Sequence, residues 1–262
     1  MSFVAYGRSI GIRVNRPEIL ERLPDRLPPG WKPAPSPAVD YLYSLLVGGS
    51  DHRSKVHRFN LVYAGPARLV RTMHLDEALE SLESDLQLYV AGVARARLFV
   101  HAGVVGWRGR AIVLPGRSGS GKTTLVAALV RAGATYYSDE YAVLDARGRV
   151  HPYPKPLSIR QENGGRPRKS PPEALGGLPG VEPLPVGLVA VTGYQPGARW
   201  RPRLLSPGQA ILALLANTVP ARRRPKAALA TLQEVVSQAP ALKGTRGEAE
   251  EMVQAILDKS ST

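Results

Sequence analysis

One nine-residue segment, residues 116–124, constrains the fold of this chain more than any other feature. It reads GRSGSGKTT and matches the pattern G-x-x-x-x-G-K-T, in which glycines let backbone N–H groups turn inward toward phosphate oxygens. Lys122 supplies a positive charge for the β- and γ-phosphates, and the Thr123 hydroxyl can complete the shell of a magnesium ion. The residues expected to bind the phosphates of a nucleotide are Gly116, Arg117, Ser118, Gly119, Ser120, Gly121, Lys122, Thr123 and Thr124.

The residues on both sides of this segment favour a phosphate-binding loop over a chance glycine-rich turn. Residues 111–114 form a short apolar run, which predicts a strand, and residues 124–130 are typical of a helix. The positive end of the helix dipole would then face the bound phosphates. The sequence therefore predicts a strand, a phosphate-binding loop and a helix in succession.

The composition places this loop in a chain with a sizeable core. Of 262 residues, 44% are hydrophobic, and none is cysteine, which excludes disulfides and thiolate metal sites. No apolar run approaches the roughly 18 residues that a membrane span requires. Arg8 and Arg13 interrupt the N-terminal segment, which therefore does not resemble a secretory signal. We expect a cytoplasmic protein without a membrane span.

The basic residues are numerous and clustered. The formal net charge is +14, and clusters lie at residues 166–169, 199–203 and 222–226. A nucleic-acid interface would interleave such clusters with aromatic side chains that stack on bases, but only Trp200 is so placed. We therefore interpret the charge as a solvated surface that attracts phosphorylated or acidic ligands, and we do not expect nucleic acid as a partner.

The chain is predicted to contain a smaller N-terminal α+β extension, residues 1–74. In it, residues 2–15 are predicted to form a strand, and residues 56–70 a hairpin after a proline-rich connector. Apolar residues then recur at helical spacing over residues 75–93. We expect the main domain, residues 75–262, to begin with this helix.

The main domain is predicted to be of the α/β class with a mixed β-sheet. Residues 98–105 and 110–114 are predicted strands joined by a tight turn, so the strand before the loop pairs antiparallel with its predecessor. Residues 161–180, rich in Gly, Pro and charge, are interpreted as a mobile loop. Further strands are expected at residues 134–137, 141–145, 149–153 and 184–191, and helices near residues 207–216, 225–238 and 247–258.

Two acidic positions compete for the metal-binding role beside the loop. Asp145 follows the apolar residues 141–144, but the tight turn after it indicates that this aspartate stabilises the turn. Asp139 and Glu140 stand where the strand after the loop helix ends, and the carboxyl ends of strands carry the chemistry of such sheets. Two adjacent carboxylates there would repel each other unless a cation such as Mg²⁺ lies between them. We therefore favour Asp139 and Glu140 over Asp145.

His101 is the third candidate residue. A lone histidine on an apolar strand is often a core residue. Here its strand neighbours the strand that leads into the loop, and His101 precedes Gly116 by fifteen residues. Its ring could therefore reach the phosphates.

Four segments together resemble the catalytic domain of the HPr kinase/phosphorylase family. That family has a histidine at the same distance before its phosphate loop and an acidic pair at the same distance after it. The resemblance implies the P-loop fold that this family shares with phosphoenolpyruvate carboxykinases, built on a mixed sheet. The segments are residues 101–104 (HAGV), 116–124 (GRSGSGKTT), 138–140 (SDE) and 148–154 (GRVHPYP).

The resemblance also implies roles for the residues. Asp139 would be the catalytic base that takes the proton of an acceptor serine hydroxyl, and Lys122 would hold the transferring phosphate. Thr123, Asp139 and Glu140 would hold Mg²⁺, His101 would lie beside the phosphates, and the nucleotide would be ATP. Glu140 stands where the family has a second aspartate, and the family's Arg-Gly-rich signature loop is not recognisable, so the acceptor stays open.

The function implied is that of a kinase that transfers the γ-phosphate of ATP to a serine hydroxyl of a protein, a peptide or a small molecule. Two alternatives stay open: a nucleotide-binding regulatory module without phosphotransfer, and a simple NTP hydrolase. Because the resembling family assembles through this domain, the resemblance also implies a possible homo-oligomer.

Overall fold

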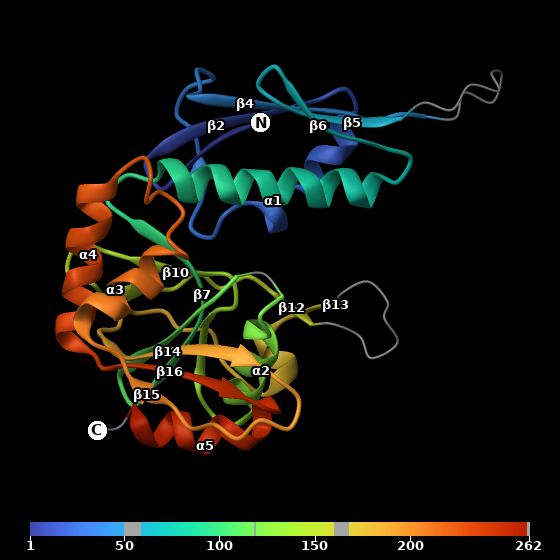
Figure 1. The fold of residues 1–262 in the computed structure, drawn as a ribbon. Helices are drawn as coiled ribbons and strands as arrows, with labels where there is room; N and C mark the ends of the chain where they lie inside the picture. Colours follow the sequence, from blue (N-terminus) through green and yellow to red (C-terminus); the bar gives the residue numbers. More distant parts are fainter. Residues whose placement is uncertain (50–58, 118, 160–167, 261–262) are drawn as a thin grey trace. The chain divides into compact units, whose positions relative to one another are not determined.

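The computed structural model describes residues 1–49, 59–117, 119–159 and 168–260. The chain divides into two compact units, Met1–Arg95 and Ala96–Thr262, each built on its own sheet (Figure 1). Both sheets combine parallel and antiparallel pairs, which confirms the predicted α/β class with a mixed sheet. Within the described ranges, no helix is both long enough and apolar enough to cross a membrane.

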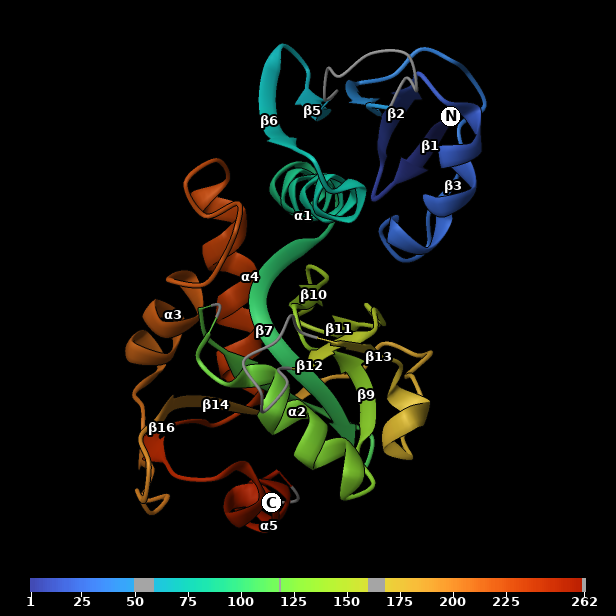
Figure 2. The ribbon, with the colours of Figure 1, turned by 90° about the vertical axis from the view of Figure 1, so that its right-hand side faces the viewer.

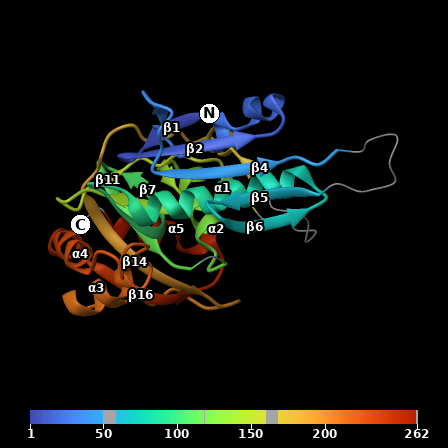
Figure 3. The ribbon, with the colours of Figure 1, turned by 90° about the horizontal axis from the view of Figure 1, so that it is seen from above.

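The sheet of the first unit has the strand order β3-β1-β2-β4-β5-β6, and Figure 3 shows β1, β2, β4, β5 and β6 side by side. The segment predicted as one strand over residues 2–15 is a hairpin, because Tyr6 and Gly7 adopt positive φ angles and reverse the chain. The predicted hairpin at β5 and β6 is confirmed, although residues 56–58 lie outside the described part of the chain. The strands are β1 (Ser2–Ala5), β2 (Arg8–Val14), β3 (Lys32–Pro33), β4 (Tyr41–Leu46), β5 (Asn60–Ala64) and β6 (Ala67–Thr72).

Helix α1 (Leu75–Val93) has the bounds that the sequence predicts. Its apolar stripe, which includes the buried Leu79 and Leu86, packs on β5 and β6. The helix therefore belongs to the first unit, whose boundary falls after Arg95. The boundary expected from the sequence lies after residue 74, one helix earlier.

The sheet of the second unit has the strand order β11-β10-β7-β8-β14-β16-β15, and β9 also pairs with β7. β7 is antiparallel to β8, β9 and β10, whereas β8, β14 and β16 run parallel. Strand β8, which precedes the phosphate loop, therefore has one antiparallel neighbour and one parallel neighbour, in agreement with the predicted mixed sheet. The strands are β7 (Leu98–Trp107), β8 (Arg110–Pro115), β9 (Thr135–Ser138), β10 (Tyr141–Leu144), β11 (Val150–His151), β14 (Val186–Tyr194), β15 (Arg203–Leu204) and β16 (Ala241–Arg246).

Helices cover both faces of this sheet (Figure 2). Leu188 and Ala190 on β14 pack in one cluster with α2 and α5, while the intervening Val189 packs in the other with α3 and α4. This alternation follows from the two-residue period of a strand. The helices are α2 (Lys122–Arg131), α3 (Pro207–Leu215), α4 (Pro225–Gln238) and α5 (Ala249–Lys259), and each lies where the sequence predicts a helix.

Part of the predicted mobile loop at residues 161–180 has regular structure. Strand β13 (Arg168–Ser170) pairs with β12 (Leu157–Ile159), and a 3₁₀ helix at Pro172–Leu175 follows. Residues 160–167 lie outside the described ranges.

Gly103 sets how closely α2 approaches the sheet. A Cβ atom at this position on β7 would lie 2.5 Å from Cγ2 of Val126 on α2, a distance at which something must move. Val126 is fully buried, and its β-branched side chain has few alternative rotamers. Glycine therefore allows the helix after the phosphate loop to pack directly on β7.

We expect Gly103→Ala to lower the free energy of unfolding by about 1–3 kcal/mol, the usual cost of overpacking a core. The matched control is Gly208→Ala, because a Cβ at Gly208, in the first turn of α3, meets no atom within 4 Å. Urea unfolding followed by circular dichroism measures both variants. Equal stability of Gly103→Ala and the wild type would contradict the tight packing of α2 on β7.

Candidate active site

The middle of β7 organises the site, because the phosphate loop begins on one edge of it and the acidic pair lies on the other. Ala102 pairs with Pro115 at the end of β8, and the N–H of Gly116 donates to the carbonyl of His101 (3.2 Å). On the opposite edge, the N–H of Ala102 donates to the carbonyl of Glu140 (3.1 Å). The loop and the acidic pair therefore meet at one point of the sheet.

Ser138 creates the interruption between β9 and β10 at which the acidic pair stands. Its buried side-chain oxygen accepts hydrogen bonds from the backbone N–H groups of Glu140 (3.1 Å) and Tyr141 (2.9 Å). Such local bonds compete with regular strand pairing. Asp139 and Glu140 therefore occupy the end of β9, as the sequence predicts.

The phosphate loop has the backbone conformation that its glycines allow. Gly119 and Gly121 adopt φ angles of 84° and 80°, in the left-handed region that other residues avoid. Helix α2 begins directly afterwards at Lys122, so its first N–H groups face the loop. The Lys122 ammonium donates to the carbonyl of Arg117 across the loop (2.8 Å). Ser118 lies outside the described residues.

The remaining loop residues also lie at this end of β8. A Cβ at Gly116 would lie 2.6 Å from Oγ of Ser120, so glycine permits the close approach of these two positions. The N–H of Ser120 donates to the carbonyl of Arg117 (3.2 Å), and Thr124 is exposed in the first turn of α2. The predicted order of strand, loop and helix is therefore present.

Asp139 connects the end of β9 to the loop. Its carboxylate accepts hydrogen bonds from the Thr123 hydroxyl (3.0 Å), the Tyr136 hydroxyl (3.1 Å) and the backbone N–H of Ser158 (3.3 Å). Burial raises the pKa of Asp139, and these hydrogen bonds offset part of the rise. A partly buried carboxylate is therefore held against the hydroxyl that the loop pattern assigns to magnesium.

Lys122 and His101 complete the cluster. Burial lowers the pKa of Lys122, and the nearby charges of Asp139 and Glu140 raise it in part. Burial, and then the charge of Lys122, lower the pKa of His101, so its imidazole is neutral at pH 7. The His101 ring lies against Tyr141, with ring centroids 4.7 Å apart. Lys122 thus lies close enough to His101, Asp139 and Glu140 for its charge to interact with each of them.

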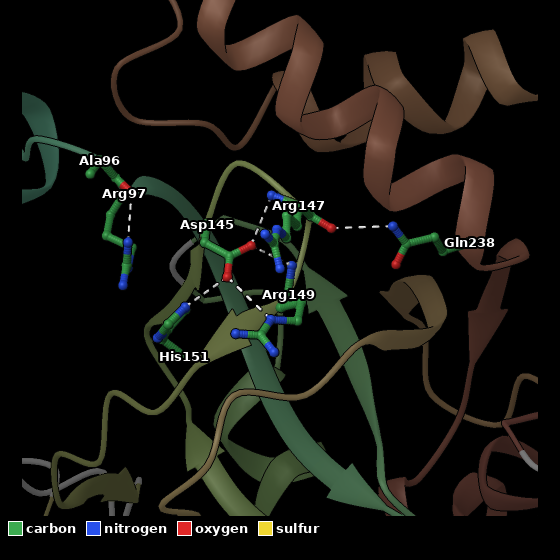
Figure 4. Close-up of polar contacts among 7 residues, drawn as sticks. All are labelled: Ala96, Arg97, Asp145, Arg147, Arg149, His151 and Gln238. Carbon is green, nitrogen blue, oxygen red and sulfur yellow. Dashed lines mark hydrogen bonds and ion pairs between the residues drawn. The ribbon is translucent and has the colours of Figure 1, made fainter.

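Asp145 lies at the other end of β10 and stabilises its own turn (Figure 4). Its carboxylate accepts hydrogen bonds from the backbone N–H groups of Arg147 (2.9 Å) and Arg149 (3.0 Å), and it pairs with His151 (3.0 Å). Burial raises the pKa of Asp145, but these hydrogen bonds more than offset the effect and lower the pKa to about 2. The turn role that the sequence indicates for Asp145 agrees with these contacts.

Arg246 is a buried charged residue beside the loop that was not predicted from the sequence. The residue is 2% exposed, and its guanidinium donates to the carbonyls of Gly121 (2.9 Å) and Gly247 (2.9 Å). Its Nε has no hydrogen-bond partner among the described residues. Burial lowers the pKa of Arg246. No sequence signal marked it, because it ends a strand without an apolar run and belongs to no motif.

Comparison of this chain with protein-family models gave no match, and comparison with curated proteins gave none either. The chemistry of the site must therefore be inferred from its own residues. The contacts that matter most are those that join the phosphate loop to Asp139.

We expect Asp145→Asn to lower the free energy of unfolding at neutral pH by about 1 kcal/mol, a value that allows for solvent screening at this site. Because the folded-state pKa of about 2 lies below the ordinary value of 3.8, the stabilisation is complete above pH of about 4 and is lost as the pH falls toward 2. Urea midpoints of variant and wild type should therefore converge over this interval. A difference that stays constant down to pH 2 would show that the charge of Asp145 does not stabilise the fold.

Proposed function

We propose that this chain is an ATP-dependent kinase of the HPr-kinase-like type, which transfers the γ-phosphate of ATP to a serine hydroxyl of a protein, a peptide or a small molecule. The observation that carries the proposal is the 3.0 Å hydrogen bond between the Thr123 hydroxyl and the Asp139 carboxylate, beside Lys122. It joins the hydroxyl of a phosphate-loop pattern, at the start of α2, to a carboxylate that follows the end of β9. The resemblance to the HPr kinase/phosphorylase family, and to its P-loop fold, supports the same function.

The side chains around Thr123 suit magnesium that is shared with nucleotide phosphates. Magnesium in proteins is usually bound by one or two carboxylates together with phosphate oxygens and water. Thr123 and Asp139 would hold the ion, with Glu140 as the second carboxylate. When bound, it would neutralise charge on the phosphates. Within the described part of the chain, no group of three or more His, Cys, Asp or Glu side chains forms a metal site of its own.

Asp139 is the residue of this cluster best suited to act on the acceptor. During transfer, a bond forms between the acceptor oxygen and the γ-phosphorus, and the bond between that phosphorus and the β–γ bridging oxygen breaks, so ADP leaves. The hydroxyl proton passes to the Asp139 carboxylate. Because burial raises the pKa of Asp139, it is a stronger base than an exposed aspartate.

Lys122 and His101 would stabilise the transferring group. The Lys122 ammonium adds positive charge where charge spreads over the phosphoryl oxygens. The neutral imidazole of His101 has one N–H that can donate to a phosphate oxygen. The site therefore combines a base, a cation and a neutral hydrogen-bond donor at one point of the sheet.

We expect Asp139→Asn to reduce phosphotransfer by at least about 100-fold, in the range of a lost general base, while ATP binding persists. The assay incubates wild type and variants with γ-labelled ATP and Mg²⁺ on an array of serine-containing peptides. Asp145→Asn is the matched control, because it makes the same chemical change at the other end of β10. Calorimetric titration with ATP measures binding in parallel.

Two controls make the result decisive. Labelling must disappear on a matching array in which alanine replaces serine, and circular dichroism must show that both variants are folded at the assay temperature. Full activity of Asp139→Asn would contradict the assigned base. Phosphate release without any acceptor would instead identify an NTP hydrolase, and ATP binding without consumption a nucleotide-binding regulatory module.

A further inference from the structure

The transfer chemistry leaves unused an aromatic side chain and a buried arginine at the ends of two neighbouring strands. Tyr194 ends β14 and Arg246 ends β16, and the two residues are directly paired. Tyr194 is 49% exposed, and it is the only aromatic residue among the exposed large apolar residues of the described chain. Tyr194 therefore presents an exposed aromatic ring at the end of β14.

The register of the sheet places Tyr194 alongside the loop. Val189 pairs with Val113, so β14 reaches the level of Pro115 at Val191 and then continues to Tyr194. The loop follows directly after Pro115. The end of β14 therefore lies at the height of the phosphate loop.

The same strand directs the Tyr194 side chain to the face that α2 covers. Leu188 and Ala190 pack in the cluster that contains α2 and α5. Side chains on a strand alternate between its two faces, so Tyr194 lies on the same face as these two residues. Tyr194 and α2 therefore share one face of the sheet.

Arg246 links Tyr194 to the loop. Its guanidinium donates to the carbonyl of Gly121, and its Cζ lies 5.3 Å from the centroid of the Tyr194 ring. The Tyr194 hydroxyl donates to Glu248 (2.9 Å). The ring is therefore held at its hydroxyl and supported by the guanidinium, while half of the residue remains exposed.

The order of the strands separates this pair from the acidic residues. Asp139 and His101 belong to the part of the sheet formed by β7, β9 and β10, on one side of β8. Tyr194 and Arg246 belong to β14 and β16, on the other side. Tyr194 and Arg246 therefore lie across β8 from Asp139, the residue that we expect at the terminal phosphates.

We propose that Tyr194 is the platform on which the base of the bound nucleoside triphosphate stacks, and that Arg246 positions this platform against the loop. The inference rests on the proposed function in one respect, namely that the loop binds a nucleotide. Stacking on an aromatic side chain tolerates every base, because each base has a π-face. The ligand class is therefore a nucleoside triphosphate. The loop binds its phosphates, and Tyr194 adds affinity by stacking on its base.

The experiment compares two ligands that share a triphosphate chain. Calorimetric titration of the full chain measures the dissociation constants of MgATP and of magnesium tripolyphosphate, which lacks the nucleoside. We expect Tyr194→Ala to weaken ATP binding about tenfold and to leave tripolyphosphate binding unchanged. Tyr194→Phe is the matched control, because it keeps the ring, and it should bind ATP within about threefold of the wild type.

Each outcome decides one question. Equal ATP affinity of Tyr194→Ala and the wild type overturns the inference, and so does an equal loss of affinity for both ligands, which would show that Tyr194 acts through the loop. A wild type that binds ATP more tightly than tripolyphosphate but transfers no phosphate overturns the kinase proposal and leaves the platform standing. A wild type that binds neither ligand overturns both.

Discussion

The pairing of β7 with strands on both of its edges is the constraint on which the candidate site depends. At Ala102, one edge meets the end of β8 and the other meets the interruption between β9 and β10. Residues that are far apart in sequence, Thr123 and Asp139, come into hydrogen-bond contact as a result. A shift of either pairing by two residues would keep the same faces buried and separate these two side chains.

The charges of the site are distributed unevenly along the edge of the sheet. The carboxylates of Asp139 and Glu140 lie on the β9 side of the loop, whereas the Arg246 guanidinium lies on the β16 side. Lys122 stands between them at the N-terminus of α2, where the helix dipole adds positive charge. The positive charges therefore lie along the loop and toward β16, and the negative charges lie at its β9 end. For the nucleotide that we propose as ligand, this charge distribution favours placing the terminal phosphates and magnesium at the β9 end.

The features that the sequence predicts best depend on local interactions. The strand, loop and helix at residues 111–130 follow from adjacent apolar and glycine positions, and α1 follows from its helical period. The turn role of Asp145 was also predictable, because its partners lie within six residues of it. The position of Asp139 beside Thr123 was inferred from strand ends and spacing, and the contact itself required the pairing of β7 with β9.

The features that the sequence analysis missed depend on distant partners. Only the first two residues of strand β16, Ala241 and Leu242, are apolar, so no apolar run marks the strand, which forms by pairing with β14. Arg246 is buried only because this pairing brings it to Gly121. The membership of α1 in the first unit likewise depends on which strands its stripe covers. Long-range pairing of this kind leaves no signature in a single segment of sequence.

The site therefore has two parts with different origins in the sequence. The predicted phosphate-binding part is a continuous segment whose glycines, lysine and threonine lie within a few residues of each other. The part beyond it is built from the ends of β14 and β16, which the parallel pairing of Tyr194 with Arg246 holds beside the loop. Arg246 donates to the carbonyl of Gly121, so the end of β16 is bonded directly to the residue that precedes α2. The backbone of the predicted phosphate loop and the ring at the end of β14 thus contact the same guanidinium, which couples the geometry of the two parts.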